Sequence, residues 1–249
     1  MYDNSVAKVA FMNGEYEKAA RMFHDGARDG DAEAAFNYGY CLLHGYGTPR
    51  NEREARSFFS FARELDGGEA AYNLASLYLS GLGGRKDFTR AVDLMKTAAS
   101  RGCVEAQLYL GMVYTLGAVI DPDIVSISLI PYHTPEYRTE TFLLEGEVSS
   151  DVQKEEEERV MAVRQNPQAA VMYFGMAARA DATYVKDLVA KGKYMYAKCY
   201  VDGFGVEFDR EKSARLMLIA GKSGSEEALV YLAERGVSRE MLGLPPKQD

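Results

Sequence analysis

Hydrophobic positions in this chain recur at the spacing of amphipathic helices. Ala34, Tyr38 and Leu42 stand four residues apart, so they fall on one stripe of a helix. A second helical stripe follows it, made of Ala55, Phe58 and Ala62. The stretch between the two stripes is polar and contains Gly45-Tyr46-Gly47, which favours a loop. The pattern therefore predicts two helices, A and B, joined by a glycine-bearing loop.

The same arrangement returns along the chain, and the first glycine of the loop recurs every 36 residues in the first three copies. The loop glycines are Gly45-x-Gly47, Gly81-x-Gly83, Gly117 and Gly203-x-Gly205. The helical stripes that follow the later loops are Ala91, Leu94 and Ala98; Ala170, Tyr173 and Ala177; and Ala214 with Met217. A fixed period of this length indicates a repeat architecture in which successive hairpins stack.

Both ends of each predicted loop have residues suited to them. The first glycine of each loop adopts the left-handed conformation that ends helix A at no steric cost. Helix B begins at capping residues: Asn51 with Glu54 three residues later, Asp87, Asp209, and Asn166 before a proline. Small residues in helix A allow helix B to approach closely, and these are Gly39, Ala75, Gly111 and Ala197.

The glycine pair invites comparison with a phosphate-binding loop. Such a loop follows a strand and opens a helix, whereas Gly45 and Gly47 follow a helix and are repeated. No Lys-Ser/Thr pair comes after them. The sequence therefore favours the hinge of a helical hairpin.

The repeated pattern resembles the Sel-one-like repeat family, which is related to the tetratricopeptide repeats. The pattern A-x-x-x-L-G-x-x-Y-x-x-G-x-G followed by A-x-x-aromatic-x-x-A-A-x-x-G fits residues 34–68, 70–102, 106 onward and 193–224. The resemblance implies an all-α fold, a right-handed α-solenoid of stacked helical hairpins. It also implies a concave groove lined by A helices, which binds a protein or peptide partner, and adaptor work without catalytic residues or cofactors.

Residues 1–249 are accordingly expected to form a single solenoid domain. Residues 5–30 look like a degenerate first hairpin with a short loop at Asn13-Gly14, and residues 225–249 look like a C-terminal capping helix and tail. Secreted members of the family carry a disulfide in each repeat. Here Cys41 and Cys199 occupy one repeat position, so buried free thiols are expected.

The groove is predicted from the helix A residues that do not belong to the packing stripe. They are Phe36, Tyr40, His44, Tyr72, Ser76, Met112, Tyr194 and Lys198. Aromatic, methionine and hydroxyl side chains in a ladder suit an extended peptide or a partner helix. For Phe36, Tyr72 and Tyr194 a place in the core is an equal alternative. Tetratricopeptide domains that clamp a terminal carboxylate have Asn where Tyr40, Ser76, Met112 and Lys198 stand, so such a ligand is not expected.

One hairpin is interrupted by an acidic insertion, residues 119–168 within the fourth hairpin. It contains eleven acidic and four basic residues, a net charge of −7. Residues 125–129 alternate apolar and polar side chains, and with residues 139–144 they predict a small β-hairpin. Two roles stay open: a solvated loop that keeps the protein soluble, or a segment that contacts a basic partner or gates the groove.

Charge and composition limit the kinds of partner that the protein is expected to bind. The net charge of −8 argues against nucleic acid and anionic membranes. Three cysteines fit neither a disulfide framework nor a zinc knuckle. The N-terminus lacks a signal-peptide pattern, and no apolar run is long enough for membrane insertion. A cytoplasmic protein is therefore expected, while its oligomeric state stays open.

Signals for catalysis are few. His24, His44 and His133 lie in separate settings without further metal ligands at suitable spacing. Ser5 and Lys8 form the S-x-x-K pattern of penicillin-binding enzymes, but the accompanying S-D-N and K-T-G are missing. The sequence thus predicts a non-enzymatic interaction scaffold, with a weak hydrolase or penicillin-binding activity at Ser5 and Lys8 as the alternative.

Overall fold

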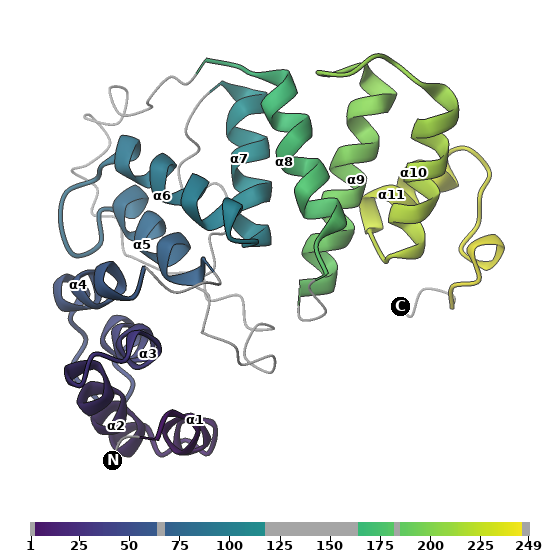
Figure 1. Cartoon of the computed structure of the whole chain (residues 1–249). Helices are drawn as coiled ribbons and strands as arrows, with labels where there is room; N and C mark the ends of the chain where they lie inside the picture. The colour runs from purple at the N-terminus through teal and green to yellow at the C-terminus, as the bar shows by residue number, and fades with distance from the viewer. Residues whose placement is uncertain (1–2, 64–67, 118–163, 182–184, 246–249) are drawn as a thin grey trace, which may run out of the picture. The chain divides into compact units, whose positions relative to one another are not determined.

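All regular structure in the described residues is helical (Figure 1). The structure, a computed structural model, describes residues 3–63, 68–117, 164–181 and 185–245. Within them lie eleven α-helices and the 3-10 helix η4, and no strand. The all-α class is therefore confirmed for this part of the chain. The β-hairpin predicted within residues 125–144 and most of the acidic insertion fall outside the described residues.

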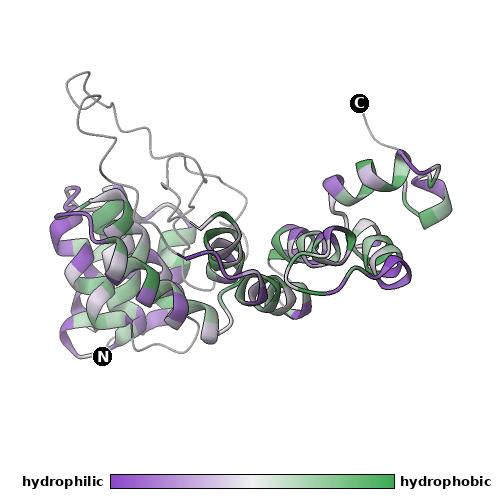
Figure 2. Ribbon diagram, turned by 90° about the horizontal axis from the view of Figure 1, so that it is seen from above, coloured by the Kyte–Doolittle hydropathy of each residue, from purple (hydrophilic) through white to green (hydrophobic). Residues whose placement is uncertain are grey.

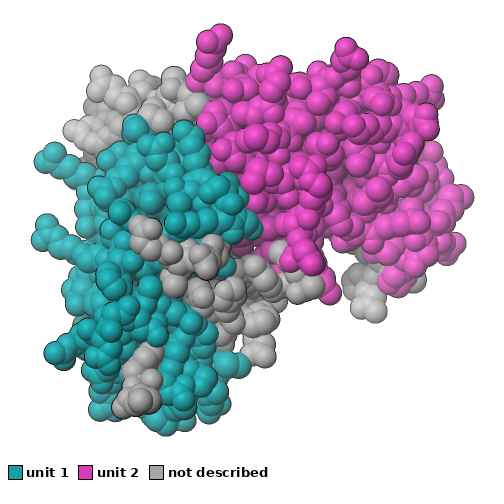
Figure 3. Space-filling view, in the orientation of Figure 1, with its two compact units in different colours: residues 1–103, 119–161 teal, residues 104–118, 162–249 magenta. Residues whose placement is uncertain are grey.

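Two compact units make up the chain, shown in different colours in Figure 3. The helices of unit 1 are α1 (Asn4–Met12), α2 (Tyr16–Arg28), α3 (Ala32–His44), α4 (Glu52–Ala62), α5 (Glu69–Ser80) and α6 (Phe88–Ser100). Those of unit 2 are α7 (Val104–Leu116), α8 (Pro167–Arg179), α9 (Lys186–Asp202), α10 (Arg210–Lys222) and α11 (Glu226–Ala233), followed by η4 (Glu240–Leu242). The single domain expected over residues 1–249 stays a prediction.

Within each unit every helix packs against the next one along the chain. The A helices are α1, α3 and α5 in unit 1 and α7 and α9 in unit 2, and the B helices alternate with them. Hydrophobic and hydrophilic residues both occur along the helical ribbons (Figure 2). This is the hairpin repeat that the 36-residue period predicts, and the degenerate first hairpin is present as α1 and α2.

The helix ends follow the sequence signals. The side chains of Asn51, Asp87, Asn166 and Asp209 each accept a hydrogen bond from a backbone N–H in the first turn of helix B. The Glu54 carboxylate accepts a hydrogen bond from the side-chain amide of Asn51. It does not accept from the backbone N–H of Asn51, because that group donates to Leu42 O. The first glycine of each loop has a positive φ, as predicted: Gly45 74°, Gly81 77°, Gly117 72° and Gly203 67°.

The four hairpins that begin with α3, α5, α7 and α9 share one backbone hydrogen bond. The N–H of the N-cap of helix B donates to the carbonyl of the residue three before the first loop glycine. The pairs are Asn51 to Leu42 (2.8 Å), Asp87 to Tyr78 (3.0 Å), Asn166 to Tyr114 (3.0 Å) and Asp209 to Tyr200 (3.3 Å). Helices α7 and α8 therefore form an ordinary hairpin of this repeat although the insertion separates them in sequence.

The second loop glycine packs against the preceding repeat. A Cβ on Gly47 would lie 2.1 Å from Tyr16 O, one on Gly83 2.3 Å from Glu52 O, and one on Gly205 2.3 Å from Pro167 O. Tyr16, Glu52 and Pro167 are the first residues of the preceding B helices. Each loop thus sits on the start of the previous helix B, and a side chain there would separate them.

The cysteine side chains are buried, as the sequence predicts for Cys41 and Cys199. Cys41 and Cys199 are buried and free, and Cys103 is buried as well. Burial raises the pKa of Cys41 to about 12 and that of Cys199 to about 11. These two cysteines therefore act as small apolar core residues in separate repeats.

Candidate protein-binding surface

Ring contacts show which side of helix A faces helix B, and the candidate binding surface lies on the opposite side. Phe36 packs against Phe59 of α4 with ring centres 5.4 Å apart, and Tyr38 packs edge-on against Phe58 of the same helix at 4.9 Å. A helix turns by about 100° per residue. The side of α3 opposite these contacts is therefore the side that carries Glu33 and the residues at helical spacing from it.

We call this side the A stripe. On α3 it consists of Glu33, Asn37, Tyr40 and His44, and on α5 of Glu69, Asn73, Ser76 and Ser80. In unit 2 it consists of Glu105, Tyr109, Met112 and Leu116 on α7 and of Lys191, Met195, Lys198 and Asp202 on α9. The α9 part is the most open, since Lys191, Lys198 and Asp202 are exposed, and Leu116 beside it on α7 is 60% exposed.

Three predicted groove residues belong to the packed interior. Phe36 has no exposed surface because it points toward helix B, where it meets Phe59. Tyr72 is likewise buried, and Tyr40 lies among aromatic rings although it is on the A stripe. Phe36 stands four residues before Tyr40, but this spacing does not show whether position 36 or position 37 faces outward. Their burial favours the core for Phe36 and Tyr72, the alternative left open in the sequence analysis, and the groove as a whole stays a prediction.

The other predicted residues occupy varied places. Ser76 is buried and its hydroxyl donates to Tyr72 O at 3.0 Å. Met112 and Tyr194 are half-buried, each packed against a hydrophobic cluster of unit 2. Lys198 is exposed and its ammonium lies 2.8 Å from Asp202, a contact that raises the pKa of Lys198. Of the predicted set, Lys198 and Met112 lie together on the open stripe of unit 2.

Sequence analysis missed the polar residues of the A stripe. Glu33, Glu69 and Glu105 repeat every 36 residues, and Asn37 and Asn73 do the same. The Nδ2 atom of Asn37 is buried without a hydrogen-bond partner. The recurrence of polar residues in the middle of otherwise apolar helices was the signal that could have identified this side.

His44 lies in a cluster of aromatic rings at the start of unit 1. Its ring centre is 4.4 Å from that of Tyr40 and 5.6 Å from that of Tyr46, and Tyr46 stacks on Tyr16 at 5.0 Å. Burial, with a smaller contribution from Arg50, lowers the pKa of His44 to about 4. The imidazole is therefore neutral at physiological pH and serves as an aromatic packing group.

This low pKa predicts that the free energy of unfolding depends on pH. In the unfolded chain His44 is protonated below its ordinary pKa of 6.5, whereas in the folded chain it stays neutral down to about pH 4. The stability present above pH 6.5 is therefore lost as the pH falls from 6.5 to 4, by up to about 3 kcal/mol. Urea unfolding at pH 7 and pH 4.5 measures it. His44→Phe keeps the ring and should lose this part of the pH dependence, whereas equal pH dependence in both proteins would contradict it.

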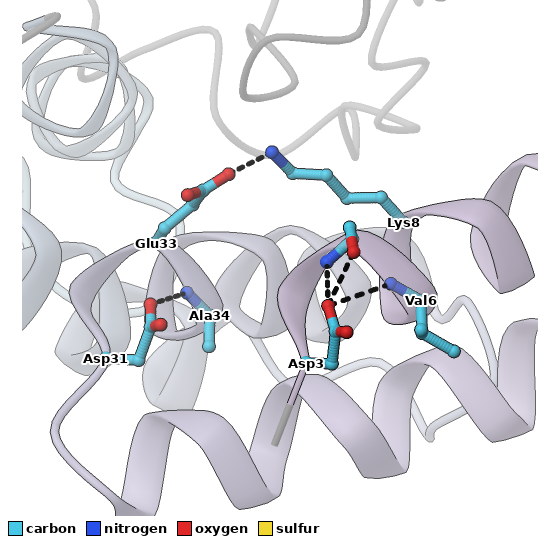
Figure 4. Close-up of polar contacts among 7 residues, drawn as sticks. Asp3, Val6, Lys8, Asp31, Glu33 and Ala34 are labelled. Atoms are coloured by element: carbon cyan, nitrogen blue, oxygen red, sulfur yellow. Dashed lines mark hydrogen bonds and ion pairs between the residues drawn. The ribbon is translucent and has the colours of Figure 1, made fainter. Parts of the chain in front are cut away.

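The alternative catalytic pair is engaged elsewhere (Figure 4). Ser5 Oγ donates to Asp3 Oδ1 at 2.5 Å, which holds the pKa of Asp3 below its usual value. Asp3 also accepts from the backbone N–H groups of Ser5 and Val6 as the N-cap of α1. The ammonium of Lys8 forms an ion pair with Glu33 of α3. Ser5 and Lys8 thus bond to different carboxylates, and nothing in this geometry supports a nucleophile and its base.

Metal-binding groups and membrane-spanning helices are absent from the described part of the chain. No group of three or more His, Cys, Asp or Glu side chains there is placed to hold a metal ion. His24 packs against the Tyr38 ring at 4.9 Å, and His133 lies outside the described residues. None of the described helices is both long and apolar enough to cross a bilayer.

Comparison with known proteins agrees with the repeat geometry. The Sel1 repeat family matches residues 32–67, 68–103, 104–126, 158–181 and 190–225. The chain belongs to the Sel1 repeat family. The first, second and last of these matches span α3–α4, α5–α6 and α9–α10, while the third and fourth contain α7 and α8 on either side of the insertion.

Two curated relatives and one solved structure extend this result. The "DAP3-binding cell death enhancer 1" proteins of Mus musculus and Rattus norvegicus are each 38% identical over 104 residues, or 41% of this chain. The match spans about a fifth of the length of these relatives, 20% in each case. The crystal structure of a Sel1 repeat protein from Oxalobacter formigenes aligns with a TM-score of 0.69 and 17% identity, over 98% of this chain and 79% of that one. This likeness shows the fold, an all-α solenoid of helical hairpins.

Proposed function

We propose that the chain is a non-enzymatic scaffold that binds a protein or peptide partner on the A stripe of unit 2. The observation that carries the proposal is the open side of α9, where Lys191 and Lys198 project from the helix face that does not pack on helix B. Helices α7 and α9 pack together, so Leu116 extends this surface with an apolar side chain. A mixed apolar and charged surface on rigid helices suits protein recognition.

The family supports this class of function. Sel1 repeat proteins are generally protein-interaction scaffolds. The relatives from mouse and rat are named for binding DAP3, which is a protein partner. Their similarity to this chain supports a protein partner here, without identifying it. The buried free thiols of Cys41 and Cys199 accord with a reducing compartment such as the cytoplasm.

The test compares two charge-matched double variants of the full chain. Leu116→Arg with Lys198→Glu changes the A stripe, and Met172→Arg with Lys222→Glu makes the same changes of charge on the B helices of the same unit. All four positions are exposed, so each variant should keep its melting temperature within a few degrees. Partners captured from the native cell are quantified by mass spectrometry.

We expect the stripe variant to lose its captured partner by tenfold or more, because charge reversal and an added charge disrupt a complementary interface. The B-helix variant should retain the partner. Equal capture by the native chain and by both variants would refute the A stripe of unit 2 as the binding surface. Loss of capture in the B-helix variant alone would move the site to the opposite side.

A further inference from the structure

A second surface, in unit 1, has a different chemistry. Arg56 of α4 and Arg90 of α6 place their guanidinium carbons 3.6 Å and 4.8 Å from the centre of the Tyr78 ring. Arg56 Nη2 donates to the carbonyl of Arg85 at 3.3 Å. Arg53 stands one turn before Arg56 on α4. We call Arg53, Arg56, Arg85 and Arg90 the arginine cluster.

The loop between α5 and α6 brings the cluster together. The loop glycine Gly83 packs on the backbone of Glu52 and Arg53, since a Cβ there would lie 3.0 Å from Arg53 N. The next residue, Gly84, makes room for Arg56, whose Nη1 would lie 2.3 Å from an added Cβ. Tyr78 stands nine residues after Glu69, which places it on the side of α5 opposite the A stripe. The cluster therefore lies off the A stripe of α5.

Among the described residues, none of the four side chains of the cluster forms an ion pair with a carboxylate. The nearby carboxylates have other roles. Glu52 pairs with Arg50 at 2.8 Å, Glu54 accepts from the side chain of Asn51 at 3.0 Å, and Asp87 caps α6. Arg56 Nε is buried without a hydrogen-bond acceptor.

A bound anion would make this arrangement more favourable. Like charges repel, and a guanidinium donor removed from water without an acceptor costs free energy. The planar fork of arginine matches the oxygens of a phosphate and binds two of them at once. Among the described residues of unit 2, Tyr200 occupies an equivalent position and has one cation, Lys212, over its ring at 4.1 Å.

We propose that the arginine cluster binds a phosphorylated side chain of a protein partner. The guanidinium groups of Arg56 and Arg90 hold the phosphate beside the Tyr78 ring, and the exposed Arg53 and Arg85 contact acidic groups around it. Recognition of a phosphorylated segment by grouped arginines is electrostatic, and it adds a phosphorylation-dependent contact to whatever binds the A stripe.

The experiment uses the full chain and fluorescein-labelled octapeptide libraries with a fixed central phosphoserine, serine or glutamate. Fluorescence anisotropy measures their dissociation constants at low salt. We expect the phosphoserine library to bind at least tenfold more tightly than the serine library, and inorganic phosphate to compete with it. Arg56→Gln with Arg90→Gln should weaken this binding tenfold or more, because two charge-assisted contacts are lost.

The matched control removes two exposed arginines of α2 in the same unit, Arg21→Gln with Arg28→Gln, and should leave the binding unchanged. Equal binding of the phosphoserine and serine libraries would overturn the proposal, as would an equal loss in this control. Equal binding of the glutamate library would overturn the assignment to phosphate in favour of carboxylates.

A second variant guards against misfolding, because Arg56 is partly buried and contributes to packing. Arg53→Gln with Arg85→Gln changes only exposed side chains, and circular dichroism should show native helix content. We expect a several-fold loss of phosphoserine binding in this variant. Full retention of binding here, together with retention in Arg90→Gln alone, would refute the site without relying on the buried arginine.

Discussion

Gly83→Ala is expected to lower the free energy of unfolding by about 3 kcal/mol or more, as measured by urea denaturation. Two costs combine. Gly83 has a φ of 71°, a left-handed conformation that disfavours any side chain. The new Cβ would also lie 2.3 Å from Glu52 O, a backbone atom fixed in the first turn of α4. The loop must therefore move away from the preceding repeat.

A matched glycine separates these two costs. Gly14 in the first hairpin loop has a φ of 79°, and a Cβ there would meet no atom within 4 Å. Gly14→Ala should therefore cost only about 1 to 2 kcal/mol, the conformational part alone. Gly47→Ala, where the Cβ would lie 2.1 Å from Tyr16 O, should resemble Gly83→Ala. Equal losses at Gly14 and Gly83 would show that contact between repeats does not explain the second glycine.

The parts of the fold that the sequence predicted are those determined by nearby residues. Asn51, Asp87 and Asp209 begin helices because each side chain accepts a bond from a backbone N–H three residues away. Gly45 ends α3 because its conformation is a local property. The period of 36 then added what local rules cannot supply, namely that the hairpins stack on one another.

The candidate surfaces depended on contacts between distant residues, which spacing alone does not reveal. Phe36 and Asn37 are adjacent and stand four and three residues before Tyr40, so both satisfy helical spacing with it. Only the position of Phe59 shows that Phe36 faces inward. The arginine cluster was hidden for a similar reason, since Arg56 and Arg90 meet through Tyr78 only when α4, α5 and α6 are packed.

Phe59→Ala is expected to lower the free energy of unfolding by about 3 to 5 kcal/mol. Its ring has no exposed surface, packs on Phe36, and lies 3.2 Å from where a Cβ of Gly39 would stand. Truncation leaves a cavity between the two helices of one hairpin. Phe61 on the same helix is 52% exposed, so Phe61→Ala should change stability by no more than about 0.5 kcal/mol. Similar losses for both variants would contradict this account of the core.

The same ring explains why helix A has a glycine at position 39, and a double-mutant cycle tests that explanation. Gly39→Ala brings a Cβ to 3.2 Å from two atoms of the Phe59 ring, which offsets the better helix propensity of alanine. In a Phe59→Leu background the ring atoms are gone, although the Ala55 carbonyl oxygen remains at 3.3 Å. The cost of Gly39→Ala should therefore fall by about 1 kcal/mol or more in that background, a coupling between residues in contact. Additive effects would mean that the glycine is not there to accommodate the ring, and that the close approach of the two helices has another cause.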